Sequence, residues 1–226
     1  MDKSTNNATK SPLALDTEIW PPLPLSADEL QDKWRAGAIL HVAGTNTLSR
    51  YIIECLTKWQ KRTMWENGLN DDSVKCYGSH DAICVMKNRQ KGVGEMSAKY
   101  GKGIWLPLED YMKQINDKKV KCWLLYPVGA NEQQGKAAAW NWFQYGFNQP
   151  YDYLAFVRLF IKSVLMDISD KAAGWEWAYW CTESVAKCWD ATGVIVYGKQ
   201  NPTPLTTEHR CGFNWSPKHE ITLEVL

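Results

Sequence analysis

The chain has 226 residues, which is enough for one domain with a sizeable hydrophobic core. Its 26 basic and 25 acidic residues give a net charge of +1, so there is no basic field for nucleic acid or an anionic membrane surface. No apolar run approaches the roughly 18–20 residues of a membrane-spanning helix, and we expect no transmembrane segment. The polar N-terminus lacks the apolar stretch of a signal peptide, which predicts a cytoplasmic protein or a mature form without its leader.

The seven cysteines are an odd number and include no Cys-x-x-Cys pair. This pattern argues against a zinc ribbon and against a fully paired disulfide framework. We expect most of these thiols to be buried in the core. His209, Cys211 and His219 share the C-terminal region without a regular ligand spacing. The sequence therefore predicts neither a metal site nor a cofactor.

The first part of the chain predicts an irregular lead-in, a helix, a strand and a second helix. Residues 1–25 are polar and then proline-rich, which is typical of a segment without regular structure. Ser26 and Glu29 have the spacing of a capping box at the start of a short helix. Residues 38–43 form a largely apolar run that indicates a strand, and residues 47–62 carry apolar side chains at helical spacing.

The middle of the chain predicts a hairpin followed by a helix, a strand and a longer helix. Residues 80–86 have the pattern of a strand, and residues 93–97 return after a polar turn. A short helix is expected near 108–115 and a strand at 120–127. Residues 132–145 place aromatic and small apolar side chains at helical spacing, which predicts the next helix.

The last third of the chain predicts two helices, a short strand and a tail. The helices are expected at about 151–165 and 181–192, the second ending before a glycine. A short strand is expected near 194–197, and residues 198–226 are interpreted as an irregular tail rich in proline and threonine. The mixture of strands and helices indicates an α+β fold, in which residues 26–226 form a single domain.

One cysteine and one histidine stand out as candidates for chemistry. Cys181 opens an amphipathic helix, where the helix dipole and free backbone N–H groups favour the thiolate. His80, at the start of an upstream strand, has the chemistry of a general base. Nucleophile, base and helix dipole together are what cysteine hydrolases use, so the pair predicts an enzyme.

Five short motifs carry a resemblance to a known family. In chain order they are Gly37-Ala38-Ile39-Leu40, Ser79-His80-Asp81-Ala82-Ile83, Gly94-Glu95-Met96, Gln149-Pro150-Tyr151-Asp152 and Cys181-Thr182-Glu183-Ser184-Val185. With these motifs, the chain resembles the permuted papain-like amidases, relatives of the NlpC-type cysteine peptidases, over about residues 36–193. It departs from the family pattern at Ala38, which replaces an aspartate, and at Ala82, which replaces a glycine.

The resemblance implies a Cys–His–Glu site. Cys181 would be the nucleophile, His80 the general base and later the general acid, and Glu95 the carboxylate that orients the imidazole. The backbone N–H of Cys181 or Thr182, at the helix N-terminus, would help to bind the oxyanion. Asp81 points to the opposite strand face from His80 and is the poorer candidate for the orienting role.

The resemblance also implies a fold and two supporting residues. The fold is α+β, a circularly permuted papain-like arrangement with a small antiparallel sheet or barrel packed against helices. Glu183 lies within the motif and is expected to support the site by hydrogen bonds. Tyr151 is expected either to support the site or merely to begin a helix.

Three functions follow from this interpretation. The first is a cysteine hydrolase that cleaves a peptide-type amide, with cell-wall peptides as a guess by analogy. The second is a lipid acyltransferase or thiol esterase on the same scaffold, and the third is a non-catalytic binding module. The expected partner is thus a peptide or a small acyl-bearing substrate, with no nucleic acid. The sequence leaves the oligomeric state open, and delivery to a cell wall would need lysis or another route.

Overall fold

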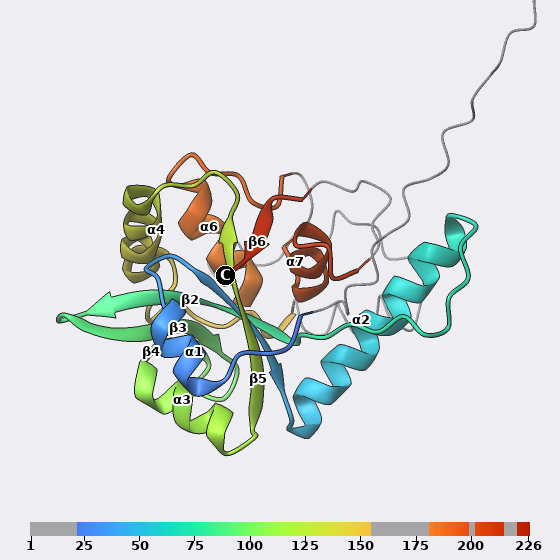
Figure 1. The fold of residues 1–226 in the computed structure, drawn as a ribbon, viewed down its shortest axis with the longest axis horizontal. Helices are drawn as coiled ribbons and strands as arrows, with labels where there is room; N and C mark the ends of the chain where they lie inside the picture. The colour runs from blue at the N-terminus through green and yellow to red at the C-terminus, as the bar shows by residue number, and fades with distance from the viewer. Residues whose placement is uncertain (1–21, 155–180, 199–201, 215–220) are drawn as a thin grey trace, which may run out of the picture.

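The computed structural model describes residues 22–154, 181–198, 202–214 and 221–226, which form an α+β fold (Figure 1). The described helices are α1 (Ala27–Lys33), α2 (Thr47–Glu66), α3 (Leu108–Asn116), α4 (Glu132–Tyr145), α6 (Cys181–Asp190) and α7 (Pro204–Arg210). The strands are β1 (Ile39–Gly44), β2 (His80–Lys87), β3 (Gln90–Ser97), β4 (Lys102–Pro107), β5 (Val120–Pro127) and β6 (Leu223–Val225). They form one antiparallel sheet in the order β4-β3-β2-β1-β5-β6.

The register of the central strands decides which side chains share a face of the sheet. β1 pairs with β2 so that His41 lies opposite Asp81 and Val42 lies opposite His80. Successive residues of a strand point to opposite faces. His80 and Asp81 therefore point to different sides of the sheet, and Asp81 shares its side with His41.

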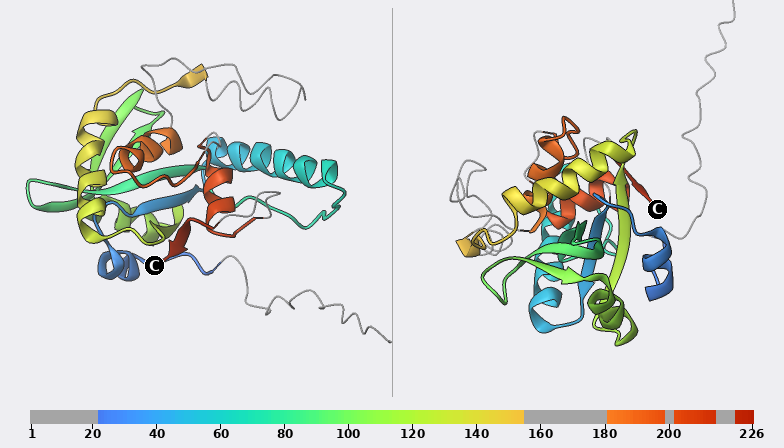
Figure 2. Two further views of the ribbon diagram at one scale, coloured as in Figure 1. Left: turned by 90° about the horizontal axis from the view of Figure 1, so that it is seen from above. Right: turned by 90° about the vertical axis from the view of Figure 1, so that its left-hand side faces the viewer.

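Helices cover both faces of this sheet. α4 and α6 pack against each other and against β2 on one face, and α1 and α3 lie together on the other (Figure 2). Gly94 of β3 allows α4 to approach closely, because a Cβ atom at this position would lie 2.3 Å from Nε1 of Trp142. The site described below forms where the start of α6 meets the start of β2.

The core between the layers is rich in aromatic side chains and thiols. Trp142 and Trp189 are among its largest fully buried side chains, and the Trp189 ring packs edge-to-face on Tyr126 at 5.4 Å. All seven cysteines lie among the described residues, and each is a buried free thiol. Burial raises the pKa of most of them, for example to about 12 for Cys122, so these thiols stay protonated and unreactive at neutral pH.

Most of the predicted elements are confirmed. The Ser26–Glu29 capping box is formed at the start of α1, and the helix predicted at 132–145 has the bounds of α4. One strand, β4, was missing from the expectation, because its sequence contains a glycine, which is uncommon within a strand. Gly103 is required there, since its ideal Cβ position lies on the carbonyl of Gly146.

The C-terminal region corrects two expectations. Residues 198–226 are not an irregular tail, because Thr203 caps α7 with Pro204 in its first turn and β6 pairs with β5. Residues 194–197 have no regular structure and do not form the expected strand. Most of the lead-in 1–25 and of the helix expected at 151–165 lies outside the described residues.

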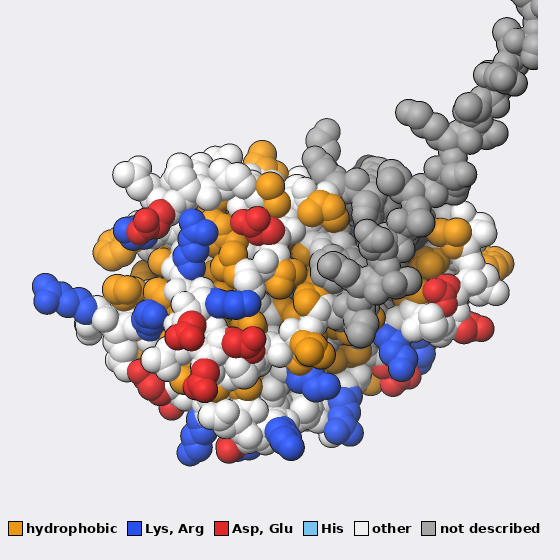
Figure 3. All heavy atoms as spheres, viewed as in Figure 1, with side chains coloured by type: hydrophobic (Ala, Val, Ile, Leu, Met, Phe, Trp, Pro, Cys, Tyr) orange, Lys and Arg blue, Asp and Glu red, His pale blue; other side chains and the backbone are white. Residues whose placement is uncertain are grey.

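The surface agrees with the balanced composition. Lysine, arginine, aspartate and glutamate side chains are interspersed on the face seen in Figure 3, without a large field of one sign. Within the described ranges, no helix has both the length and the apolar character needed to cross a bilayer.

Candidate active site

Packing of α6 fixes the position of Cys181. Near the end of the helix, the indole Nε1 of Trp189 donates to the carbonyl oxygen of Gly37 at 3.0 Å. The amide of Asn141 on α4 donates to the carbonyl oxygen of Cys188 at 3.0 Å. These two hydrogen bonds hold the helix against the segment before β1 and against α4. Cys181, the first residue of the helix, is 4% exposed.

His80 contacts Cys181 from the first position of β2. Its side chain is 22% exposed. Burial by itself would lower the pKa of His80, but the charge and hydrogen bond of Cys181 raise it well above its ordinary value, with a further contribution from Glu95. The two side chains are thus close enough for a proton to pass between the thiol and the imidazole.

Glu95 completes the line of side chains. Asn88 and Arg89, with φ angles of 50° and 65°, form a two-residue turn that sets the β2–β3 register. This register places Glu95 on the same face as His80, and the two side chains approach to 3.6 Å between Oε2 and Nε2. Burial opposes the charge on Glu95, but His80 and the hydroxyl of Tyr111 hold the pKa of this carboxyl below its ordinary value.

Tyr111 is the orienting partner of Glu95 and was not predicted from the sequence. Its hydroxyl, on α3, donates to Oε2 of Glu95 at 2.5 Å, the same oxygen that faces the histidine. A short hydrogen bond to a charged carboxylate is among the stronger ones in proteins. Tyr111 therefore limits the movement of Glu95 and, through it, of the imidazole.

A cavity of about 450 Å³ opens beside this line of residues. His80, Glu95 and Tyr151 are among the described side chains in its wall. Burial first, and then the neighbouring Cys181, raise the pKa of Tyr151, which places the phenol next to the thiol as well. The structure therefore brings together all three expected catalytic residues and one of the expected supporting residues.

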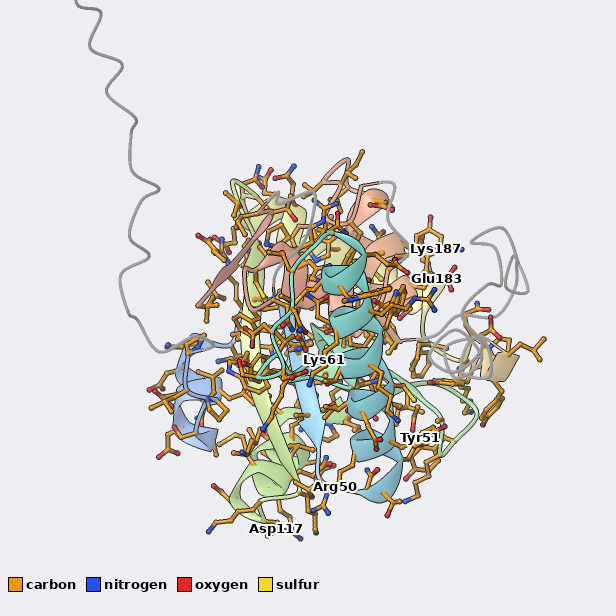
Figure 4. The ribbon with its side chains drawn as sticks, turned by 90° about the vertical axis from the view of Figure 1, so that its right-hand side faces the viewer. Arg50, Tyr51, Lys61, Asp117, Glu183 and Lys187 are labelled. Carbon is orange, nitrogen blue, oxygen red and sulfur yellow. The ribbon has the colours of Figure 1, made fainter. Side chains whose placement is uncertain are left out.

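Thr182 and Glu183 differ in exposure, since only Thr182 is buried. Thr182 is fully buried, and its hydroxyl donates to Oδ2 of Asp81 at 2.6 Å. The expectation that the backbone N–H of Cys181 or Thr182 helps to bind an oxyanion stays a prediction, because residues 155–180, which precede α6, lie outside the described residues. Glu183 is partly exposed, one turn before Lys187 on α6 (Figure 4).

A second cluster of polar side chains lies on the Asp81 face of the sheet. Nδ1 of His41 contacts Oδ1 of Asp81 at 2.7 Å, and Nε2 contacts Oε1 of Glu208 at 3.2 Å. The backbone N–H groups of Tyr77 and Gly78 donate to the same Glu208 oxygen at 2.7 and 2.8 Å. We call His41, Asp81 and Glu208 the buried triad, since all three side chains are fully inaccessible.

Little in the local sequence pattern indicates the buried triad. Asp81 was expected to face away from His80, and the geometry agrees with this expectation. Glu208 was missed because residues 198–226 were interpreted as irregular. The signal available was Thr203-Pro204, which is typical of a helix start. In the parts of the chain that the structure describes, no group of three or more acidic, histidine or cysteine side chains is arranged to hold a metal ion.

Comparison with known proteins does not identify a family for this chain, so the functional inference rests on the geometry of the site. No protein-family model and no curated protein matches the chain. Among solved structures, it is similar to one described as the metalloprotein YiiX of Escherichia coli O157:H7, DUF1105. The sequence identity is 17% and the TM-score 0.44, over 84% of this chain and 88% of that chain. A likeness at this level assigns no function.

Proposed function

We propose that the chain is a cysteine hydrolase that cleaves a peptide-type amide bond, with a fold of the permuted papain-like kind. The observation that carries the proposal is the position of His80, which contacts the Cys181 thiol and lies 3.6 Å from the Glu95 carboxylate beside a cavity. A histidine with a purely structural role is not expected to contact both a thiol at the start of a helix and a carboxylate. Cell-wall peptides are the first amides to screen.

The reaction follows from the roles of the three side chains. His80 takes the proton of the Cys181 thiol, and the thiolate attacks the amide carbonyl carbon to give a tetrahedral intermediate. The imidazolium then donates its proton to the leaving amine as the C–N bond breaks, which leaves an acyl-thioenzyme. Water, deprotonated by His80, attacks the thioester carbonyl and releases the carboxylic acid and the thiol. Glu95 keeps its charge throughout and stabilises the imidazolium.

The cavity lining favours a second candidate, an acyltransferase or thiol esterase. Its wall is largely apolar, which suits an acyl chain better than a peptide backbone. The aliphatic side chains in the wall are Val42, Leu48, Ile52, Met96, Ala98 and Val120. Hydrolysis of p-nitrophenyl esters of increasing chain length distinguishes the two candidates. A rate that rises with chain length supports acyl chemistry, and a flat dependence supports the amidase.

Alkylation of Cys181 with iodoacetamide, followed by mass spectrometry, tests the shared chemistry. The other six cysteines are internal controls, because they are buried as Cys181 is, whereas the thiol coupled to His80 is that of Cys181. We expect Cys181 to react rapidly well below the ordinary thiol pKa of about 8.5, and to lose this reactivity in His80→Ala, because the imidazolium stabilises the thiolate. Labelling of Cys181 no faster than the controls, and indifferent to His80, would show that the fold exists without the chemistry.

A further inference from the structure

The start of α6 and the start of β2 meet through two adjacent pairs of residues. Cys181 contacts His80, whose side chain lines the cavity. The next residue of each element, Thr182 and Asp81, form a hydrogen bond of 2.6 Å on the other face of the sheet. The contact between nucleophile and base is therefore one residue away, on both elements, from a buried hydrogen bond.

The Asp81 carboxylate is rigidly held. Oδ1 contacts His41 at 2.7 Å, and Oδ2 accepts hydrogen bonds from Thr182 and from Thr207 of α7 at 2.6 and 2.8 Å. Asp81, His41, Thr182 and Thr207 are all fully buried. A buried, charged and fully bonded carboxylate has one low-energy position, because each displacement breaks hydrogen bonds that water cannot replace.

The other end of the buried triad fixes the chain just before His80. Glu208 accepts hydrogen bonds from the backbone N–H groups of Tyr77 and Gly78 and contacts His41. A Cβ atom at Gly78 would lie 2.1 Å from Nε2 of His41, so only glycine permits this close approach. The buried triad thus holds the segment that leads into His80 as well as the residue that follows it.

We propose that Asp81 is a positioning residue that sets the contact between Cys181 and His80 through its hydrogen bond to Thr182. This inference rests on the proposed function, because positioning has meaning only if the thiol reacts. A free helix start could shift along the sheet by an ångström, and a displacement of that size in a catalytic pair can cost about a hundredfold in rate. The charge on Asp81 takes no part in proton transfer.

Thr207→Val provides a matched control for Thr182→Val. Both variants remove one hydroxyl donor from the same oxygen of Asp81 and keep the shape of the side chain. Only Thr182 is bonded covalently to the nucleophile. We expect Thr182→Val to slow alkylation of Cys181 at pH 6.5 about tenfold or more, and Thr182→Ser to restore it. Thr207→Val should lower the thermal unfolding temperature similarly but keep the wild-type pH profile of Cys181 alkylation.

A double-mutant cycle separates the proposed path from a direct one. The Thr182 hydroxyl also lies 3.8 Å from the Cys181 sulfur and could act on the thiol directly. If Thr182 acts through Asp81, the effects of Asp81→Asn and Thr182→Val on alkylation will not add in the double variant. If Thr182→Val fails to fold, Asp81→Asn tests the same hydrogen bond by changing its acceptor.

Three results would overturn the inference. They are a Thr182→Val protein that is alkylated as fast as wild type, a Thr207→Val protein that loses as much reactivity as Thr182→Val, and effects of Asp81→Asn and Thr182→Val that add. In each of these cases the wild-type protein still shows an activated Cys181, and the proposed function stands. Wild-type Cys181 labelling no faster than the six other cysteines would instead contradict the proposed function, and the inference with it.

Discussion

Two histidines of this chain meet carboxylates on opposite sides of one sheet. His41 is fully buried between Asp81 and Glu208, whereas His80 is 22% exposed and lies between Glu95 and a thiol at the wall of a cavity. Burial opposes the charge of both imidazoles, yet their acidic neighbours, and for His80 also the thiol, raise both pKa values above the ordinary range.

The comparison shows that a histidine–carboxylate pair does not by itself indicate catalysis. The histidine–carboxylate contacts of the buried triad, at 2.7 and 3.2 Å, are shorter than the 3.6 Å between His80 and Glu95, as expected of a structural ion pair. The His80 site is looser, because a general base must be free to exchange a proton. Access to a cavity and the presence of a nucleophile, rather than the strength of the pair, distinguish the two.

Substitution of one acid at each site, Glu208 in the buried triad and Glu95 in the candidate active site, gives the largest expected effects. Glu208→Gln replaces the charge that two backbone N–H groups and His41 share, and should lower the free energy of unfolding by about 3–5 kcal/mol. Glu95→Gln should cost about 1 kcal/mol of stability but slow Cys181 alkylation at pH 6.5 about tenfold or more, as loss of a triad acid does. Chemical denaturation and the alkylation assay measure both quantities in each variant. The larger loss of stability in Glu95→Gln, together with the slower alkylation in Glu208→Gln, would contradict this comparison.

The pH dependence of stability sharpens the same comparison. The pKa of His41 rises to about 9 in the folded chain, because Asp81 and Glu208 outweigh the effect of burial. The folded protein therefore holds this proton more tightly than the unfolded chain. The stabilisation is complete below the unfolded pKa of about 6.5 and is lost as the pH rises through about 9, by at most about 3 kcal/mol.

His41→Gln isolates this contribution. The titration of His80 is common to both proteins, so it cancels in the difference between the two curves of unfolding free energy against pH. We expect that difference to be largest near pH 6 and to shrink as the pH rises towards 9. A difference that stays constant with pH would mean that His41 is neutral in the folded protein.

The smallest expected effect concerns the orienting tyrosine. Tyr111→Phe removes one hydrogen bond to Glu95 and should cost about 1 kcal/mol, with alkylation of Cys181 slowed a few-fold. Tyr126→Phe is the control, since its hydroxyl donates to the carbonyl oxygen of Asn131 at 3.1 Å, away from the site. Equal alkylation rates in the two variants would show that Tyr111 does not act on the imidazole.

The sequence was sufficient to predict the parts of the candidate site that depend on local residue patterns. Helical spacing placed Cys181 at the start of α6, and strand alternation separated His80 from Asp81. The face of Glu95 could not be predicted, because it depends on the turn at Asn88 and Arg89. Arginine is not a residue that normally indicates a left-handed turn conformation.

The buried triad depended on contacts that no local pattern contains. Glu208 meets Gly78 across a separation of 130 residues, and Asp81 meets Thr207 across 126. A carboxylate in a region rich in threonine and proline has the composition of a solvent-exposed loop, so its burial follows only from the tertiary fold. For the same reason β4 was missed, because its one glycine, Gly103, is needed for the close approach of Gly146 rather than by the strand itself.

The short strand β6 has a consequence for association between molecules. Leu223–Val225 pair with β5, the N–H of Leu226 donates to the carbonyl of Leu124 at 2.9 Å, and Lys33 donates to the carbonyl of Leu226 at 2.9 Å. Without these residues, β5 would present unpaired backbone groups along a hydrophobic edge, which is a template for strand exchange between molecules. Leu223–Val225 thus cover the backbone edge of β5 at Leu125, Tyr126 and Pro127, where a second molecule could otherwise pair.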